Sequence, residues 1–418
     1  MSRLFIAALL VLCFGASSVA FGQSDGTGFK AGSTQTTPFG GPNSPGGQLD
    51  ESKRVREPAF RFPAAYDAFE PWRNWKERMS DEHGFEFTGH YTTLYQTLSD
   101  SLSGEDTASS GVFRATAKWT LFGRGTKDTG SLVAMIDNRH KFRDVAPADL
   151  ASQAGYAGVT GTLYSDIDWA LVNLNWQQAF NDRTAGLLIG RYDPNDYMNV
   201  LGYTNPWTTF SNLAILLDAS VAFPDASWGV AGGSWFRDQV FAMGGVNDAN
   251  GTVTDNLEFF DDGSEFFTWG AFGWSPTQGD RYFKNVHATL WHVDQREQAG
   301  IDSGKGIALA GNWTFNDQFM PFVRAGFSDG TAPIYNRSFT LGFIKKFLVR
   351  SDLVGIGFNW GDPAADGLRE QKTIEAFWRF QFAQNFAITP SIQWLIDPAL
   401  NPERDEVGLF GLRLRLTF

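Results

Sequence analysis

The chain has 418 residues and a formal net charge of −12, and 15% of its residues are aromatic. Its mean hydropathy is only −0.23, and it has a single apolar run of any length, whereas a helical membrane protein needs several runs of about 20 apolar residues. The sequence therefore excludes a bundle of membrane helices. The acidic balance argues against nucleic acid as a partner, because phosphate binding needs a basic surface.

The only apolar run lies at the N-terminus and predicts a secretory signal peptide over residues 1–22. Arg3 supplies the positive start, residues 4–14 form the apolar core, and small residues follow up to Gly22. Such a run is too short for a membrane span and has the order of regions typical of a signal peptide. Because the only cysteine, Cys13, lies inside it, we expect the mature chain to have neither disulfides nor thiol chemistry.

Two different segments are expected between the signal peptide and the first strand. Residues 23–57 are rich in Gly, Pro, Ser, Thr and Gln without apolar periodicity, which is typical of a flexible low-complexity segment. Residues 58–83 predict a short amphipathic helix that starts near Glu70 and stops at Gly84. Its apolar positions recur at three- and four-residue spacing, at Phe69, Trp72, Trp75 and Met79. We expect this N-terminal helical segment to be periplasmic, as a plug or cap of the barrel or, alternatively, as a binding site for a partner.

From residue 84 to 418 the periodicity changes to two residues, which predicts an all-β transmembrane domain. In the last segment Leu and Phe occupy one face up to Phe418, and Arg413 and Arg415 occupy the other. Arginines that alternate with leucines fit a strand with lipid on one side and water on the other, rather than a soluble core. The alternating segments predict an antiparallel β-barrel of about sixteen strands, at 84–97, 111–122, 130–140, 166–180, 184–191, 226–235, 238–247, 264–274, 284–293, 304–315, 318–328, 337–346, 351–360, 371–382, 385–395 and 405–418.

The links between these segments alternate in length. Short turns are expected at 181–183, 236–239, 316–317 and 383–384, and longer links lie between them, of which 192–225 is the longest. This alternation is typical of outer-membrane barrels, which have short periplasmic turns and longer external loops. A barrel of about sixteen strands leaves an aqueous channel, whereas one of about eight is filled by side chains.

From about residue 58 to 418 the chain resembles the carbohydrate-selective outer-membrane porin family. Three features carry the resemblance: the helix with Trp72 and Trp75 that leads into the first strand, the stretch 130–140, and the ending 397–402 with the Leu/Arg strand up to Phe418. The resemblance implies a sixteen-stranded pore for the passive uptake of sugars. Because porins commonly trimerise, it also implies a homotrimer.

The link 192–225 is the candidate constriction of the pore, because a long porin loop can fold into its barrel. It carries carboxylates and aromatic rings, at Asp193, Asp196, Tyr203 and Trp207. This combination suits sugars, since their C–H faces stack on rings and their hydroxyls bond to charged groups. The alternative is a surface loop that is packed by its own aromatic residues.

Charged residues on the polar faces of the strands are candidates for the lining of the lumen. They are Arg114, Lys118, Arg324, Glu375, Arg379, Arg413 and Arg415, with Glu86 as a further carboxylate. Such charges would set the electric field of the pore and its ion preference. The alternative is that they pair with one another and only keep the interior hydrated. Asp137 and Arg139 are expected near the outer mouth, and Trp119, Trp274, Trp313, Trp378 and Trp394 in the aromatic girdles.

We therefore expect a porin of the bacterial outer membrane, through which carbohydrates or other small polar solutes diffuse passively. Its partners are these solutes and the membrane lipid. No enzyme activity, cofactor or metal is expected, because the sequence has no nucleophile or phosphate-loop motif and its five histidines lack ligand spacing. One alternative is a structural barrel that anchors the envelope through its N-terminal segment. The other is a soluble secreted β-protein, against which the Leu/Arg strand and the alternating links count.

Overall fold

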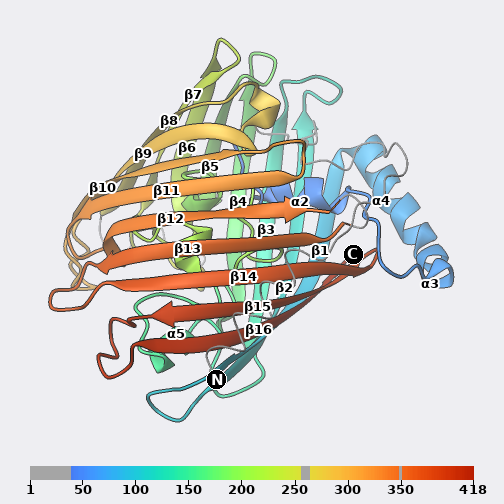
Figure 1. Ribbon diagram of the computed structural model, residues 1–418. Coiled ribbons are helices and arrows are strands. Elements are labelled where there is room, and N and C mark those ends of the chain that lie inside the picture. The colour runs from blue at the N-terminus through green and yellow to red at the C-terminus, as the bar shows by residue number, and fades with distance from the viewer. Residues whose placement is uncertain (1–38, 256–263, 348–350) are drawn as a thin grey trace.

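The computed structural model describes residues 39–255, 264–347 and 351–418, so the predicted signal peptide lies outside the described residues. Sixteen antiparallel strands form a closed barrel in this part of the chain (Figure 1). The strands are β1 (Phe85–Leu98), β2 (Thr107–Phe122), β3 (Gly130–Lys141), β4 (Asp168–Phe180), β5 (Ala185–Tyr192), β6 (Ser227–Phe236), β7 (Val240–Asp248), β8 (Phe266–Trp274), β9 (Lys284–Val293), β10 (Gly304–Trp313), β11 (Phe319–Asp329), β12 (Tyr335–Lys346), β13 (Leu353–Pro363), β14 (Gln371–Ala383), β15 (Phe386–Ile396) and β16 (Glu406–Thr417).

Each strand pairs with its neighbours in sequence, and β1 pairs with β16 to close the sheet. The predicted number of strands is thereby confirmed, with bounds that differ by a few residues. For example, β2 begins at Thr107 instead of near residue 111. Residues 107–110 pair with residues 94–97 of β1 through the backbone, although their small side chains show no apolar alternation.

The predicted alternation of lumen-facing and lipid-facing side chains is confirmed. On β16, Arg413 and Arg415 face the lumen and are 2% and 5% exposed, whereas Phe410 and Leu416 face outward and are 44% and 48% exposed. A barrel wall with one wet and one lipid-facing side requires this arrangement.

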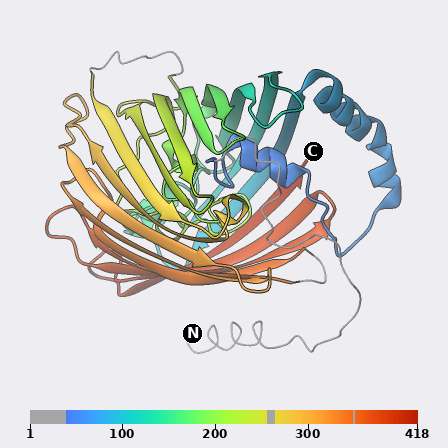
Figure 2. The same cartoon turned by 90° about the horizontal axis from the view of Figure 1, so that it is seen from above.

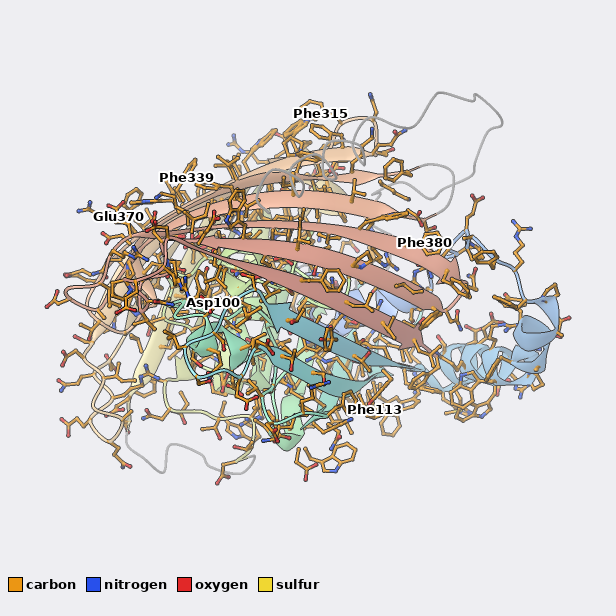
Figure 3. All side chains as sticks on the ribbon, turned by 60° about the horizontal axis from the view of Figure 1, so that its bottom comes forward. Asp100, Phe113, Phe315, Phe339, Glu370 and Phe380 are labelled. Atoms are coloured by element: carbon orange, nitrogen blue, oxygen red, sulfur yellow. The ribbon has the colours of Figure 1, made fainter. Side chains whose placement is uncertain are left out.

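The outer surface carries many aromatic side chains. Figure 3 shows Phe113, Phe339 and Phe380 on the outside of the wall. The tryptophans expected in the girdles also lie on outward faces, with Trp394 half-buried and the others exposed: Trp119, Trp274, Trp313 and Trp378. Aromatic residues of this kind are enriched where a membrane meets water.

The short turns contain residues with positive φ, among them Asn181, Asp182, Asn316 and Asp317. Asn and Asp tolerate the left-handed region better than other non-glycine residues, so these dipeptides allow tight reversals between strands. The short turns lie at the end of the barrel that also holds the C-terminus, which is the periplasmic end of an outer-membrane barrel.

Five α-helices accompany the strands in the described residues: α2 (Pro45–Ser52), α3 (Pro63–Ala68), α4 (Glu70–His83), α5 (Leu150–Gln153) and α6 (Leu213–Leu216). The predicted start and stop of α4 are confirmed, since it begins at Glu70 and ends before Gly84. Gly84 has a φ of 66°, and its N–H donates to the carbonyls of Met79 and Ser80 and so caps the helix. No helix in the described ranges is long and apolar enough to cross a membrane.

The positions of these helices correct the expectation for the N-terminal region. Helix α4, expected as a plug or cap, lies outside the barrel beside the start of β1, whereas α2 lies inside (Figure 2). α2 belongs to the segment expected to be flexible. Its Gly-rich sequence has poor helix propensity, but Ser44 caps the helix by accepting a hydrogen bond from the N–H of Gly47, and Pro45 occupies the first turn.

Candidate pore constriction

The link between β5 and β6, residues 193–226, lies inside the barrel and is called the constriction loop here. Glu375 on β14 accepts hydrogen bonds from the backbone N–H of Ser211 at 2.8 Å, its hydroxyl at 3.0 Å and the N–H of Asn212 at 2.9 Å. Several strands separate β14 from β5 and β6 in either direction around the barrel. The loop therefore crosses the lumen, which is the first of the two interpretations of the sequence, and does not lie on the surface.

Two lumen-facing arginines hold the backbone of the constriction loop. Arg324 on β11 donates to four oxygens of the loop at 2.7 to 3.2 Å, three of which are backbone carbonyls. Arg413 on β16 donates to the carbonyl oxygens of Pro206 and Thr209. These arginines and Glu375 were expected to line the lumen. Their hydrogen bonds instead hold the constriction loop in position.

Aromatic residues of the barrel wall also pack against the constriction loop. Phe210 of the loop lies between Phe322 and Phe377, with ring centroids 5.8 and 5.0 Å away, and Tyr203 lies 4.1 Å from Phe322. Phe322 and Phe377 interrupt the polar, lumen-facing sides of β11 and β14. Burial of these rings stabilises the inward position of the loop in addition to the hydrogen bonds.

Arg114 on β2 forms a two-pronged ion pair with Asp137 on β3, at 2.6 and 2.7 Å. Asp137 also accepts from Arg139 at 2.8 and 3.0 Å, and all three side chains are buried. The guanidinium of Arg114 lies 4.7 Å from the centre of the Trp207 ring. The expectation that Asp137 and Arg139 line the outer mouth is corrected, because together with Arg114 they form a closed cluster that supports the constriction loop.

Residues 39–56, called the lumen segment, enter the barrel at its periplasmic end. The hydroxyl of Tyr282, in the turn between β8 and β9, donates to the carbonyl of Phe39 at 2.6 Å. Arg281 from the same turn lies 5.2 Å from the Phe39 ring. Farther along, α2 contacts β1, β2 and β3. The sequence placed this part of the chain in a flexible segment, and its long-range contacts explain why it is ordered.

Asn43 joins the lumen segment to the constriction loop and to the wall. Its side-chain oxygen accepts from Arg114 at 3.1 Å and from the indole N–H of Trp207 at 2.9 Å. Its amide N–H donates to a carboxylate oxygen of Asp196 at 2.8 Å, and the N–H of Gly41 donates to the Asp196 carbonyl at 2.7 Å. One asparagine thus connects three separate parts of the chain inside the barrel.

Glu51 fixes the other end of the lumen segment. Its two carboxylate oxygens accept from Arg415 on β16 at 2.8 and 3.0 Å, and one of them also accepts from Arg56 at 3.0 Å. Burial alone would raise the pKa of Glu51, but Arg415 and Arg56 outweigh it and hold that pKa well below its ordinary value. Glu51 is therefore a charged group that pins the segment to the wall.

Asp193 and Asp196 lie at the start of the constriction loop. Burial raises the pKa of Asp193, and burial together with the neighbouring Asp193 raises the pKa of Asp196 well above its ordinary value. Asp193 accepts from the N–H and the side-chain amide of Asn195, both at 2.9 Å. The Asp193 carboxylate caps the 3-10 turn (Pro194–Asp196) at the point where the chain turns inward.

The other two predicted charges lie in the periplasmic half of the lumen. Lys118 is 3.6 Å from Glu86, which also binds Lys53 at 2.5 Å. Arg379 donates to Gln381 at 2.9 Å. Each of the predicted lumen charges thus has a partner within the protein.

A cavity of about 90 Å³ remains between the lumen segment, the constriction loop and the wall. Its lining combines rings, hydroxyls, an amide and charges, including Tyr203, Tyr282, Asn205, Thr208, Asp50 and Arg379. Only Tyr203 and Arg379 among the predicted site residues border this cavity. The others hold the elements that enclose it.

Sequence reasoning missed Asn43, Glu51 and Tyr282. The pair Ser44-Pro45 is a helix-start signal that could have marked the lumen segment as ordered. Phe322 and Phe377 on polar strand faces were a signal for an inward loop. Arg415, the partner of Glu51 on the barrel wall, by contrast lies 364 residues away, and no local pattern points to it.

Comparison with known proteins agrees with this geometry. Residues 295–418 match the family described as carbohydrate-selective porin, OprB family. The chain is 25% identical to porin AaxA of Chlamydia pneumoniae over 73% of its own length and 71% of that protein. It is 22% identical to porin AaxA of Chlamydia felis over 71% of its length and 68% of that protein.

Among solved structures, OprB of Pseudomonas putida at high pH superposes with a TM-score of 0.69 at 14% sequence identity, covering 83% of this chain and 97% of the other. That likeness shows a shared fold. A closed barrel of sixteen strands, a family match in its C-terminal strands and porin relatives along most of its length identify the chain as an outer-membrane porin for the passive diffusion of small solutes, similar to the carbohydrate-selective OprB family.

Proposed function

We propose that the solutes of this porin are carbohydrates. The observation that carries the proposal is the lining of the cavity between the lumen segment, the constriction loop and the wall, to which the aromatic residues Tyr203 and Tyr282 and the polar residues Thr208 and Asn205 all contribute. Sugars present apolar C–H faces and a rim of hydroxyls, so they suit rings that adjoin hydrogen-bonding groups. The match to a family described as carbohydrate-selective supports the same solute class.

The predicted site residues have two roles in this proposal. Tyr203 and Arg379 border the solute path directly. The remaining ones act as positioning residues. The constriction loop is held by Arg324, Glu375 and Arg413. The lumen segment is held by Arg114, Asp196, Trp207 and Arg415, and the residues next to these two elements include Lys118, Asp193 and Glu86. The width of the path is then set by how these two elements are held.

The test is liposome swelling with purified protein, neutral sugars of increasing size and a charged solute of matching size. We expect swelling that declines with sugar size and exceeds that for the charged solute. Equal swelling by both solutes contradicts carbohydrate preference. Absence of swelling by folded, inserted protein contradicts the pore itself and favours a structural barrel that anchors the envelope.

A single variant tests whether the preference for carbohydrates arises in this cavity. Thr208→Val removes a hydroxyl at nearly constant volume. We expect sugars to block ion current roughly 2- to 10-fold less tightly, the equivalent of one hydrogen bond of about 0.5–1.5 kcal/mol. Thr268→Val, on the outward face of β8, is the matched control and should leave the sugar block unchanged. An equal effect of the two substitutions would place the sugar elsewhere.

We also propose that the porin is a homotrimer. The outer wall over β6–β8 supports this, because Gly232, Gly244 and Gly270 lie in direct register on neighbouring strands and leave the wall flat there. Small residues allow close approach between membrane segments. Chemical cross-linking in native membranes should give a species of three chains, and recovery of single chains alone contradicts the proposal.

A further inference from the structure

Residues 58–83, called the rim arm, leave the lumen and continue outside the barrel. At the periplasmic end of β14, the N–H groups of Ala59 and Phe60 donate to the carbonyls of Gln381 and Phe382 at 2.8 and 3.0 Å. From there α3 and α4 return toward the start of β1 on the outside (Figure 1). The arm therefore passes along the periplasmic rim beside the lipid-facing wall.

Among the described residues, helix α4 lacks the protein cover that a helix of its length needs. It has 14 residues, and none of them is buried. Isolated helices this short are marginal in water, and helices in proteins gain most of their stability from a covered apolar face. The apolar face of α4 carries Trp72 and Trp75, and Phe69 precedes them at the N-cap; the three side chains are 39%, 39% and 59% exposed.

The apolar face of the arm is continuous with the surface that contacts lipid. The rings of Trp72 and Trp75 lie 5.6 and 5.3 Å from Phe87, which points outward from β1. At the other end of the arm, Phe60 lies 4.9 Å from Phe382, which points outward from β14. Both contacts lie at the periplasmic ends of strands. These ends are at the level of the membrane interface, where tryptophan is enriched.

Basic groups accompany this aromatic face. The guanidinium of Arg73 lies 3.6 Å from the Tyr66 ring, and the ammonium of Lys76 lies 5.2 Å from the Phe87 ring. Long basic side chains can lay their stems along apolar surface while the charge reaches polar headgroups. Interfacial helices characteristically combine aromatic anchors with such basic residues.

We propose that the rim arm is a membrane-binding element that lies in the periplasmic leaflet of the outer membrane. Its aromatic face sits at the boundary between headgroups and acyl chains, and Arg73 and Lys76 face the phosphates of anionic phospholipid. A second copy of the chain is the other conceivable cover. Lipid is favoured because the face continues the lipid-contacting wall at Phe87 and Phe382.

The test uses single-cysteine variants labelled with an environment-sensitive fluorophore. Cys13 is the only cysteine in the sequence, so Cys13→Ala gives a background without thiols. Phe69→Cys carries the label on the apolar face. Asn74→Cys is the control, five residues farther along and therefore about 140° around the helix, at an exposed position.

The labelled porins are reconstituted in vesicles of phosphatidylethanolamine and phosphatidylglycerol, with either nitroxide-labelled lipid or aqueous iodide as the quencher. We expect at least threefold stronger quenching by the lipid nitroxide at position 69 than at position 74, and the reverse order with iodide. Equal access of iodide to both positions overturns the proposal, because the face is then in water. Protection of position 69 from both quenchers also overturns it, since protein then covers the face. Unchanged ion conductance shows that the labelled barrels are intact.

Discussion

At the scale of single residues, Glu51 has the most consequential charge in the lumen. It forms ion pairs with both Arg415 and Arg56, and all three side chains are nearly inaccessible to solvent. Removing one partner of such a group leaves buried charge uncompensated, which costs about 3–5 kcal/mol. Glu51 therefore contributes strongly to the hold of the barrel on the α2 end of the lumen segment, whereas Asn43 holds the other end.

We predict that Glu51→Gln releases the lumen segment and raises the single-channel conductance in planar bilayers. The reason is that Arg415 and Arg56 then repel each other beside a neutral amide. Glu57→Gln is the matched control, because Glu57 is exposed just outside the lumen, and its conductance should equal that of the unmodified protein. An unchanged conductance of Glu51→Gln would show that the segment does not limit the current.

The pH dependence of the conductance follows from the same residue. The pKa of Glu51 in the folded protein is well below its ordinary value of 4.5, so its stabilising effect is fully present above that value. It is lost only as the pH falls through the lowered pKa. Asp193 and Asp196 have raised pKa values and protonate at higher pH than Glu51, so any change that they cause is the same in the unmodified protein and in Glu51→Gln. We expect an additional increase in conductance below about pH 4.5 that is present in the unmodified protein and absent in Glu51→Gln. The same low-pH increase in both proteins would contradict the assignment to Glu51.

At the scale of elements, the constriction loop depends on lumen-facing glycines as well as on arginines. A Cβ at Gly357 on β13 would come within 2.5 Å of the Ile215 side chain, so the wall needs a residue without a side chain where the loop rests on it. Gly270 on β8 faces outward, and a Cβ there would meet nothing closer than 3.9 Å.

We predict that Gly357→Leu displaces the constriction loop and that Gly270→Leu does not. Overpacking of this kind typically costs about 1–3 kcal/mol. The loop variant should therefore admit larger sugars in liposome swelling and become accessible to protease between residues 193 and 226. The control adds only a lipid-facing leucine to the wall. If both variants keep the original size limit, the loop does not set it.

Only part of these elements could be predicted from sequence. The length and aromatic content of the constriction loop indicated a path into the lumen as one of two interpretations, and its partners could not be predicted. Arg324 and Glu375 lie on the polar faces of alternating strands. This pattern is the same whether such a residue faces solute or binds a loop. The lumen segment could not be predicted, because its order comes from contacts such as Asn43 with Asp196, 153 residues apart, and not from its own propensity.

At the scale of the whole molecule, the barrel could be predicted because its physics is local. Lipid on one side and water on the other impose a period of two on every strand, and short turns alternate with long links. The filling of the lumen depends on loops and an N-terminal segment that fold back from distant positions. For this reason the wall was predicted well, while the expected roles of α4 and of residues 39–57 needed correction.

Closure of the barrel is the property that belongs to the whole chain, and Phe418 extends the seam between β1 and β16 by one residue. The N–H of Phe418 donates to the carbonyl of Gly89 at 3.0 Å, and its carbonyl accepts from the Gly89 N–H at 3.2 Å. The Phe418 ring also stacks at 6.1 Å on Phe113 of β2, so it spans the seam and reaches the strand beyond β1. Phe410 on β16 is similarly exposed, at 44% against 41% for Phe418.

We predict that Phe418→Ala destabilises the barrel by about 0.5–1.5 kcal/mol more than Phe410→Ala, because only the first removes an aromatic pair across the seam. Both substitutions lose a comparable outward ring, so their difference isolates the closure contact. Urea unfolding in detergent micelles, followed by the gel shift between folded and heated barrels, measures the free energies of unfolding. Equal stabilities would mean that the backbone pairing at Gly89 closes the barrel unaided, and the terminal ring would then serve assembly in the cell instead of the stability of the finished barrel.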